Sequence, residues 1–455
     1  MEKLVTSNLK MGIIAGGQLG KMLIQEASKW DITTYVLDKD KNCPSARIAS
    51  HYLKGDQLDF YDVYQFGRHL DVVTYEIENI NIEALKKLKS DGVQVLPDPD
   101  TLEMIQDKGL QKEFYTKHKV PTTPFKNYPS KDDILNAVTA GSLSVPFVQK
   151  LRSGGYDGRG VSVIKNDESL KKLMDGPSMV EELVDIDKEI AVIVARNNRG
   201  DIRCFPAVEM VFDPVANLVE MLVCPASISK KITEQASDIA TTIVSNLHYT
   251  GLLAIEFFID KKGQLLVNEI APRPHNSGHH TIESVITSQY EQHLRAILNL
   301  PLGSTHLKMP AVMINLLGEP GHIGQVNYEG LTESMAIEGV KVHVYGKKET
   351  WPMRKMIMPA LLSIMTRPIS SSVLRTKTMS ASIPSRNRSC CNSTKPYLRL
   401  IFWRTEQLGA CHQSSRYLSS ACCVPAAPCW NASSAAIPTS KVVASSPIYA
   451  RLRAA

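Results

Sequence analysis

Two glutamates on the arms of one predicted hairpin could hold a divalent cation. Glu256 lies in the apolar run Leu-Leu-Ala-Ile-Glu-Phe-Phe, and Glu269 lies in Leu-Leu-Val-Asn-Glu-Ile. A turn at 260–263 would place Glu256 opposite Val267 and diagonal to Glu269, about 7–8 Å away between α-carbons. Two carboxylates so close repel each other, and a bound Mg²⁺ or Mn²⁺ would relieve the repulsion. The alternative is a solvated sheet face on which both side chains meet water.

A stiff loop rich in hydrogen-bond donors follows the second glutamate directly. Its sequence over residues 271–279 is Ala-Pro-Arg-Pro-His-Asn-Ser-Gly-His. Two prolines restrict the backbone, and Arg273, His275 and Asn276 offer donors suited to a small oxyanion. An anion held there would lie beside the γ-phosphate of a nucleotide bound at the metal. His279 is expected to serve packing rather than metal binding.

A glycine-rich loop next to charged side chains indicates a nucleotide site. Residues 150–160 are Lys-Leu-Arg-Ser-Gly-Gly-Tyr-Asp-Gly-Arg-Gly. The glycines let the backbone approach a polyphosphate closely, and Lys150 and Arg159 offer it positive charge. The spacing differs from the Walker A pattern, so this is not a P-loop. A plain hairpin turn, the alternative, would seldom combine so many glycines with Lys, Arg and Asp.

A second glycine turn, Gly16–Gly20, follows an apolar strand and opens a helix. Backbone N–H groups at such a helix start can hold a phosphate. Ala15 occupies the place of the first glycine of the dinucleotide pattern, whereas Asp38 ends the next strand as that pattern requires. Two alternatives stay open: the NAD-binding domain of a dehydrogenase, and a tight turn without a ligand.

The elements that must position these residues begin with a region of alternating strands and helices. Such alternation up to about Asp107 predicts an α/β domain with a doubly wound parallel sheet. The expected strands are Met11–Ala15, Ile32–Leu37, Asp71–Glu76 and Val93–Leu96, and the expected helices are Lys21–Trp30 and Asn81–Lys89.

The pattern then changes to strands joined by short turns, which predicts an α+β region with antiparallel sheet. Its expected strands are Ser144–Lys150, Val161–Lys165, Ser178–Leu183, Glu189–Ala195, Ile202–Met210, Leu252–Asp260 and Gln264–Ile270. Its expected helices are Glu168–Met174 and Ile232–Leu247. A smaller segment, Pro301–Met358, contains one more expected strand, Ala311–Leu317.

The net charge of +6 is an average over two unlike segments. Residues 359–455 carry 12 Lys and Arg and a single acid, Glu406, which leaves 40 basic and 45 acidic residues before them. The body of the chain is therefore acidic, so its charge does not indicate nucleic-acid binding. No apolar run approaches the roughly 18–20 residues that cross a bilayer. A cytoplasmic protein with neither nucleic acid nor membrane as a partner is expected.

Three motifs together resemble the 5-(carboxyamino)imidazole ribonucleotide synthase family of ATP-grasp ligases. They are Gly-Gly-Gln-Leu-Gly at 16–20, Gly-Gly-Tyr-Asp-Gly-Arg-Gly at 154–160 and Asn-Glu-Ile-Ala-Pro-Arg-Pro-His-Asn-Ser-Gly-His at 268–279. Their order and spacing fit the family from about Met11 to Met356. The resemblance implies an N-terminal α/β domain at 1–107, an ATP-grasp domain with antiparallel sheet at 108–300, a small truncated C-terminal domain at 301–358 and a basic tail at 359–455.

Members of this family use ATP and Mg²⁺ to activate bicarbonate as carboxyphosphate, which carboxylates 5-aminoimidazole ribonucleotide in purine synthesis. The resemblance therefore implies the same reaction, these small-molecule partners and a homodimer. One alternative is another ATP-grasp ligase of purine synthesis, such as a formate-dependent glycinamide ribonucleotide transformylase. Another is a nucleic-acid-binding protein that uses the basic tail.

The resemblance also assigns roles to residues that match the family's motifs. The implied ATP contacts are Lys108, Lys150, Gly155, Tyr156, Asp157, Gly158, Arg159, Gly160, Val161, Glu181, Glu182, Leu183, Val184, Glu189, Asn268 and Glu269. The implied metal ligands are Glu256 and Glu269. The implied ribonucleotide contacts are Glu76, Tyr156, Asp157, Arg159, Arg354 and Lys355. The implied catalytic residues at the bicarbonate and carboxyphosphate site are Arg273, His275 and Asn276.

Two positions depart from the family pattern. Phe212 stands where the family often has histidine, and residues 357–359 replace the Gly-His that follows Arg354-Lys355-Met356. One choice of codons for 357–368, shifted in frame, encodes His-Ala-Cys-Ile-Ile-Val-Asp-Asn-Asp-Pro-Ala, which suits the strand expected there. The charge of the chain changes at the same place. We therefore interpret 359–455 as the product of a one-base frameshift, against the alternative of a natural disordered extension.

Overall fold

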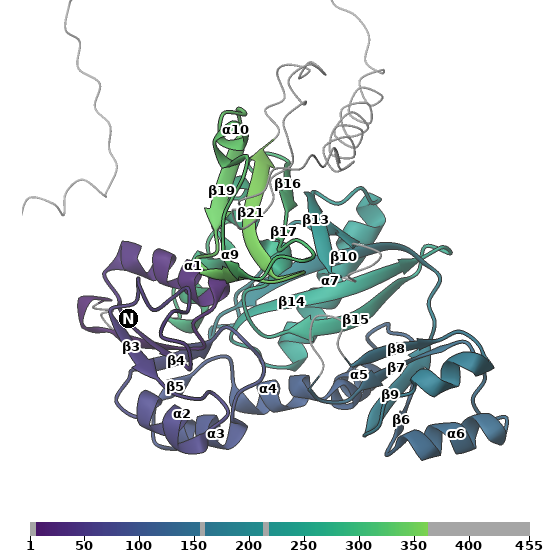
Figure 1. The fold of residues 1–455 in the computed structure, drawn as a ribbon. Helices are drawn as coiled ribbons and strands as arrows, with labels where there is room; N and C mark the ends of the chain where they lie inside the picture. Colours follow the sequence, from purple (N-terminus) through teal and green to yellow (C-terminus); the bar gives the residue numbers. More distant parts are fainter. Residues whose placement is uncertain (1–5, 155–159, 213–217, 363–455) are drawn as a thin grey trace, which may run out of the picture. The chain divides into compact units, whose positions relative to one another are not determined.

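The computed structural model of the protein describes residues 6–154, 160–212 and 218–362. In these ranges the chain forms sheets of five, ten and four strands, a two-stranded ribbon and flanking helices (Figure 1). None of the helices described is long and apolar enough to cross a membrane. The segment from 363 to the end, and with it the frameshift interpretation, lies outside the described residues.

The N-terminal sheet is parallel and carries helices on both faces, as predicted. Its strand order is β3-β2-β1-β4-β5. The strands are β1 (Lys10–Ile14), β2 (Thr33–Asp38), β3 (His51–Lys54), β4 (Val72–Tyr75) and β5 (Gln94–Val95), and the helices are α1 (Gln18–Ala27), α2 (Phe60–Gly67), α3 (Ile82–Ser90) and α4 (Pro99–Gln106). Side chains alternate along β1, so Met11 packs in the core that includes α1, whereas Ile14 packs with α2 and α3.

In this region the sequence patterns miss β3, α2 and α4. Strand β3 pairs only with β2 and lies at the sheet edge, where His51 and Leu53 are exposed, so its residues do not alternate between apolar and polar. Helix α2 begins after Asp59, whose carboxylate accepts a hydrogen bond from the backbone N–H of Asp62. This N-cap signal precedes the helix in the sequence and could have revealed it.

A four-stranded antiparallel sheet with order β6-β9-β7-β8 follows helix α5 (Lys108–Lys117). Its elements are β6 (Phe125–Tyr128), α6 (Lys131–Thr139), β7 (Phe147–Leu151), β8 (Val161–Ile164) and β9 (Ser178–Glu182). The helix expected at Glu168–Met174 is instead a 3-10 helix at Asp167–Lys172.

The ten-stranded sheet is antiparallel at every pair, and the chain of strands is β15-β14-β10-β12-β13-β16-β21-β17, with β11 beside β10 and β19 beside β21. The elements from 186 to 297 are β10 (Ile186–Arg196), β11 (Ile202–Cys204), β12 (Val208–Phe212), β13 (Val219–Cys224), α7 (Lys230–Asn246), β14 (Gly251–Asp260), β15 (Leu265–Ala271), α8 (Thr281–Ser284) and α9 (Gln289–Ile297). Those that follow are β16 (Ala311–Ile314), β17 (Leu316–Leu317), β18 (Gly324–Gln325), α10 (Leu331–Met335), β19 (Val340–Val344), β20 (Glu349–Thr350) and β21 (Lys355–Leu362). The strands expected at Ile202–Met210 and Ala311–Leu317 are each divided in two.

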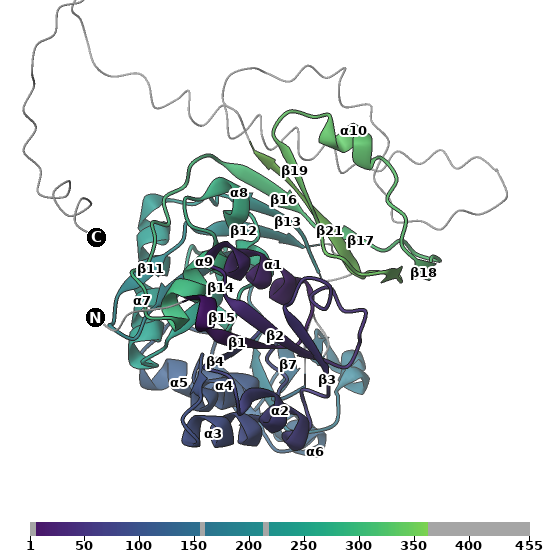
Figure 2. The ribbon, with the colours of Figure 1, turned by 90° about the vertical axis from the view of Figure 1, so that its left-hand side faces the viewer.

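Strand β21 corrects the predicted start of the tail. It pairs with β16 and β19 as far as Leu362, and Ala360 and Leu362 are buried between their neighbours (Figure 2). Residues 359–362 therefore belong to the sheet and not to the predicted tail. The boundaries expected at 107/108 and 300/301 stay predictions.

Helix α9 joins the large sheet to the N-terminal sheet. His293 on this helix accepts the backbone N–H of Leu252 through Nδ1, at 3.2 Å, so its Nε2 carries the proton that faces Thr74 Oγ1 at 2.9 Å. Tyr290 and Leu294 on the same helix pack in one core with residues of α1 and β13. This contact places the end of β4, and thus Glu76, beside the large sheet.

Candidate active site

The hairpin β14–β15 brings the two predicted metal ligands directly opposite each other. Its turn is fixed by Asp260, whose carboxylate accepts the backbone N–H groups of Lys262 and Gln264. The predicted register is wrong: Glu256 pairs with Glu269, and a bulge follows before the next pair. An extra residue in β15 at the bulge therefore moves the carboxylates from diagonal to facing positions, which brings them closer together.

The two carboxylates have different electrostatic surroundings. Glu269 forms an ion pair with Lys108 at 2.6 Å, and the charge of Lys108 lowers the pKa of Glu269. Burial raises the pKa of Glu256, and the charge of Glu269 raises it further. An oxygen-seeking divalent cation fits this pair because it favours both ionised forms. Over the described ranges no group of three or more His, Cys, Asp or Glu is arranged to hold a metal.

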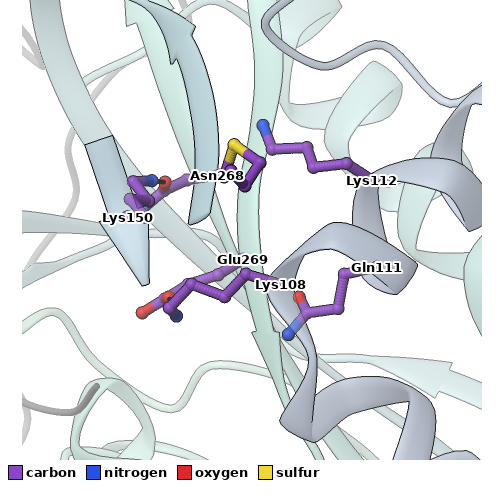
Figure 3. A pocket seen from close by; sticks show the side chains of 7 residues that line it. Lys108, Gln111, Lys112, Lys150, Asn268 and Glu269 are labelled. Atoms are coloured by element: carbon purple, nitrogen blue, oxygen red, sulfur yellow. Dashed lines mark hydrogen bonds and ion pairs between the residues drawn. The ribbon is translucent and has the colours of Figure 1, made fainter. Parts of the chain in front are cut away.

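A lysine-lined pocket lies next to this hairpin (Figure 3). Lys150 at the end of β7 forms an ion pair with Glu181 at 2.6 Å and donates to Asn268 Oδ1 at 2.8 Å. Lys108 at the start of α5 approaches from the other side. The residues that line the pocket are Lys108, Gln111, Lys112, Lys150, Met179, Asn268 and Glu269.

Three pocket residues, Gln111, Lys112 and Met179, were not among the sequence candidates. Lys112 follows Lys108 by four residues on α5, and this spacing puts both side chains on one helix face. The N-cap Asp107 accepts the N–H groups of Gly109 and Leu110, so the helix itself has a sequence signal. The N-cap residue and the four-residue spacing together could have predicted that Lys112 lies beside Lys108.

The connection between the small and large sheets carries the other predicted nucleotide contacts. Glu181 is buried at the end of β9, whereas Glu182 and Leu183 are exposed and Val184 is half-buried. Glu189 lies on β10, where burial raises its pKa to about 7. Gly160 and Val161 lead into β8, and residues 155–159 of the glycine loop lie outside the described residues.

The loop after β15 brings the three predicted oxyanion residues together. Gln289 holds the loop because it accepts the His275 backbone N–H at 2.9 Å and donates to its carbonyl at 2.8 Å. Arg273 forms an ion pair with Glu78 at 2.8 Å. The side-chain oxygen and nitrogen of Asn276 are both buried and have no hydrogen-bond partner in the described part of the chain. A buried amide of this kind is suited to receive a polar ligand.

His275 is neutral and presents a single N–H donor. Burial lowers its pKa to about 3, and the charge of Arg273 acts in the same direction. Its Nδ1 accepts the backbone N–H of Ser277 at 3.3 Å, so the neutral ring carries its proton on Nε2. That atom lies 3.6 Å from Glu256 Oε1. The oxyanion loop therefore borders the carboxylate pair.

The first glycine turn is closed by carboxylates. Asp38 Oδ2 accepts the Gly16 N–H at 2.7 Å, and buried Glu76 accepts the N–H groups of Gly17 and Gly20. A phosphate at this helix start would meet two carboxylates in place of free donors, which disfavours the NAD-binding alternative. Burial raises the pKa of Glu76, and the positive charge of Arg273 on the oxyanion loop acts in the opposite direction.

The two predicted basic contacts after β20 have different positions. Lys355 begins β21, and its positive charge contributes to lowering the pKa of His275 in the oxyanion loop. The guanidinium of Arg354 instead lies over the Trp351 ring, with its carbon 3.6 Å from the ring centroid, and donates to the Glu349 carbonyl at 2.6 Å. Phe212, at the departure from the family pattern, packs against the core that holds α9.

Comparisons with known proteins match all three regions of the described chain. Three family models match: a ribonucleotide synthetase preATP-grasp domain over residues 9–106, an ATP-grasp domain over 113–290 and a phosphoribosylaminoimidazole carboxylase C-terminal domain over 311–356.

Two relatives are similar in sequence. The chain is 39% identical over 355 residues to the chloroplastic phosphoribosylaminoimidazole carboxylase of Vigna aconitifolia, covering 76% of this chain and 62% of the relative. It is 36% identical over 351 residues to the N5-carboxyaminoimidazole ribonucleotide synthase of Bacillus subtilis, covering 76% of this chain and 89% of the relative. The chain thus spans less than two thirds of the plant relative.

Two solved structures are similar in fold. The N5-carboxyaminoimidazole ribonucleotide synthetase of Thermotoga maritima has a TM-score of 0.72 and 45% identity, covering 78% of this chain and 94% of the other. The Aspergillus clavatus N5-carboxyaminoimidazole synthase, in complex with ADP and 5-aminoimidazole ribonucleotide, has a TM-score of 0.71 and 29% identity, covering 79% and 95%.

Proposed function

Because the chain belongs to the N5-carboxyaminoimidazole ribonucleotide synthase family of ATP-grasp ligases, we propose that it carboxylates 5-aminoimidazole ribonucleotide with bicarbonate and ATP. The products are N5-carboxyaminoimidazole ribonucleotide, ADP and phosphate. The observation that carries this proposal is the adjacency of two sites. The carboxylate pair and the lysine-lined pocket border a loop whose buried donors suit a small oxyanion.

ATP binds between the two antiparallel sheets in this proposal. Lys108 and Lys150 supply positive charge to the phosphates, and Glu189 and the connection at 181–184 hold the nucleoside. The glycine motif at 155–161 is assigned to the phosphates because its glycines allow close approach of a polyphosphate; residues 155–159 lie outside the described residues. Without these contacts the polyphosphate would remain hydrated and free to reorient.

Mg²⁺ is the proposed metal ion, held by Glu256 and Glu269. Bound there it would neutralise charge on the phosphates and withdraw electron density from the transferred group. The facing register of the two carboxylates supports this assignment.

Bicarbonate lies in the loop at 273–276. Arg273 offsets its charge, and the His275 Nε2–H and the Asn276 amide orient its oxygens. One bicarbonate oxygen attacks the γ-phosphorus of ATP, and ADP leaves with the electron pair of the broken P–O bond. Since His275 is neutral, it orients this oxygen by a hydrogen bond without placing a positive charge beside it.

The amine of the ribonucleotide then attacks the carbonyl carbon of carboxyphosphate. The C–O bond to phosphate breaks, and the departing phosphate can accept the proton that the amine loses. From the motifs, Glu76, Tyr156, Asp157 and Arg159 are proposed to face the ribonucleotide, and Arg354 and Lys355 its phosphate. The effect of the Lys355 charge on His275 supports the part assigned to Lys355.

The proposal extends to a cytoplasmic homodimer built from the three parts at 1–107, 108–300 and 301–358, with the last extended to 362. ADP release followed with each substrate omitted in turn tests the reaction. We expect the fastest release only when ATP, bicarbonate and the aminoimidazole ribonucleotide are all present. ADP release driven instead by formate and glycinamide ribonucleotide would support the transformylase alternative and contradict the proposal.

A further inference from the structure

Lys112 on α5 is a buried lysine whose ammonium group makes three contacts. Its side chain is 2% exposed. Its Nζ lies 2.6 Å from Thr122 Oγ1, 2.7 Å from Thr123 Oγ1 and 2.8 Å from Glu181 Oε2. A lysine ammonium has three N–H donors, so each donor has an acceptor. Lys112 therefore has no donor left for a nucleotide, although it lines the pocket.

Glu181 is shared by two lysines. Its Oε1 pairs with Lys150 at 2.6 Å, and its Oε2 meets Lys112 and the hydroxyl of Thr123. Burial alone would raise the pKa of Glu181, but the charges of Lys150 and Lys112 outweigh it and lower the pKa to about 2. The carboxylate is therefore ionised, and each lysine holds one of its oxygens.

Lys112 also ties the two antiparallel sheets together at this point. Thr122, which accepts from Lys112, donates through its hydroxyl to the Val267 carbonyl on β15 at 2.7 Å. Glu181 belongs to β9 of the small sheet, and Asn268, the next residue of β15, accepts from Lys150. Lys112 thus holds one oxygen acceptor of Lys150, Glu181, directly, and through Thr122 it is linked to β15 at the residue before the other acceptor, Asn268.

We propose that Lys112 is a positioning residue that holds the Glu181 carboxylate, so that the Lys150 ammonium stays directed toward the phosphates of ATP. This inference rests on the ATP use proposed above. Among the described residues Lys150 donates to two oxygens, Glu181 Oε1 and Asn268 Oδ1, which leaves one of its three N–H donors for a phosphate oxygen.

The charges around Glu181 predict the effect of replacing Lys112. Lys112 and Lys150 are the lysine partners of Glu181, whereas Lys108 pairs with Glu269. Replacing Lys112 by an uncharged residue removes one positive charge and leaves Glu181 with Lys150 as its only lysine partner among the described residues. The carboxylate then draws Lys150 into a neutral pair and away from the phosphates.

The test is Lys112→Met, which keeps the length and apolar stem of the side chain but not its charge. We expect the KM for ATP and the Kd for ADP to rise about 10- to 100-fold, because a ground-state contact is weakened, while kcat changes less than about threefold. Lys117→Met is the matched control, since Lys117 lies exposed on the same helix, and its constants should equal those of the wild type.

A second substitution separates positioning by charge from a purely structural role. In Lys112→Met/Glu181→Gln the net charge of the site returns to that of the wild type, and the carboxylate that pairs with Lys150 is gone. We expect the Kd for ADP of the double variant to fall below that of Lys112→Met. A merely structural Lys112 predicts the opposite, a double variant that binds at least as weakly as the single one.

The outcomes separate this inference from the reaction on which it rests. Wild-type Kd and KM in folded Lys112→Met, or a double variant weaker than the single one, would overturn the positioning role alone. A wild-type protein that binds no ADP would overturn the ATP use and this inference with it. Should Lys112→Met fail to fold, as judged by thermal melting, Lys112→Gln keeps a donor for Thr122 and carries the same comparison.

Discussion

Replacing Glu269 by glutamine removes one charge from the carboxylate pair and keeps the size of the side chain. Glu269 faces Glu256 across the hairpin and pairs with Lys108 at 2.6 Å. In the variant, Lys108 meets an uncharged amide oxygen in place of a carboxylate oxygen. The substitution therefore weakens the proposed metal site and leaves a lysine without its ionic partner.

The expected loss follows from those two contacts. Exchanging a charge-assisted hydrogen bond for a neutral one costs about 1–2 kcal/mol, which falls mainly on the stability of the protein. Removing one of two anionic ligands from a site that stabilises the transferred phosphoryl group costs about 3–4 kcal/mol in the barrier. That is a fall of roughly 10²- to 10³-fold in ATP turnover.

The assay is ADP release at saturating Mg²⁺, ATP, bicarbonate and ribonucleotide, with thermal melting of each variant in parallel. Glu234→Gln is the matched control, because its carboxylate lies exposed on α7 and has no part in the site. Its turnover should equal that of the wild type. Turnover within about threefold of the wild type in folded Glu269→Gln would remove Glu269 from the metal site and refute this reasoning.

Three further outcomes follow from the structure. Arg273→Ala should lower bicarbonate-dependent turnover about 100-fold and leave the Kd for ADP within about tenfold; a collapse of ADP binding by calorimetry would place Arg273 in the nucleotide site. A chain ended after Met358 should have a free energy of unfolding about 3 kcal/mol below that of one ended after Leu362, and should melt at a lower temperature, because it lacks the buried Leu362 side chain and strand hydrogen bonds; equal melting temperatures would contradict this. Burial lowers the pKa of His293 to about 3, so its contribution to stability is full above pH 6.5 and is lost as pH falls toward 3, by up to about 1.4 kcal/mol per pH unit; acid denaturation of His293→Gln should show a shallower slope.

The local patterns of the sequence were sufficient where a strand or helix buries one regular face. The strands at 33–38 and 72–75 and the helix at 82–90 lie within a few residues of their predicted places because each packs in the N-terminal core. The same logic fails for β3, which lies at an edge with exposed side chains. An apolar period arises where an element buries one face, so an element with little burial cannot be predicted from it.

Part of the candidate site could likewise be predicted from the sequence, and part of it could not. The two carboxylates and the oxyanion loop could be predicted because their residues adjoin in sequence and share one hairpin. Their register could not, since a bulge inserts one residue without changing the apolar pattern on either side. Nor could the bond from Glu76 to the glycine turn, or the sharing of Glu181 by Lys112 and Lys150, because these contacts join distant parts of the chain.

Oxygen transfer from bicarbonate to phosphate tests the central claim most directly. If the loop at 273–276 holds bicarbonate for attack on ATP, one of its oxygens must remain on the phosphate that leaves carboxyphosphate. The protein would be mixed with ATP, the aminoimidazole ribonucleotide and freshly dissolved ¹⁸O-bicarbonate, and the phosphate analysed by mass spectrometry. We predict one ¹⁸O in each phosphate formed; phosphate that carries no ¹⁸O while ADP and carboxylated ribonucleotide accumulate would contradict the account.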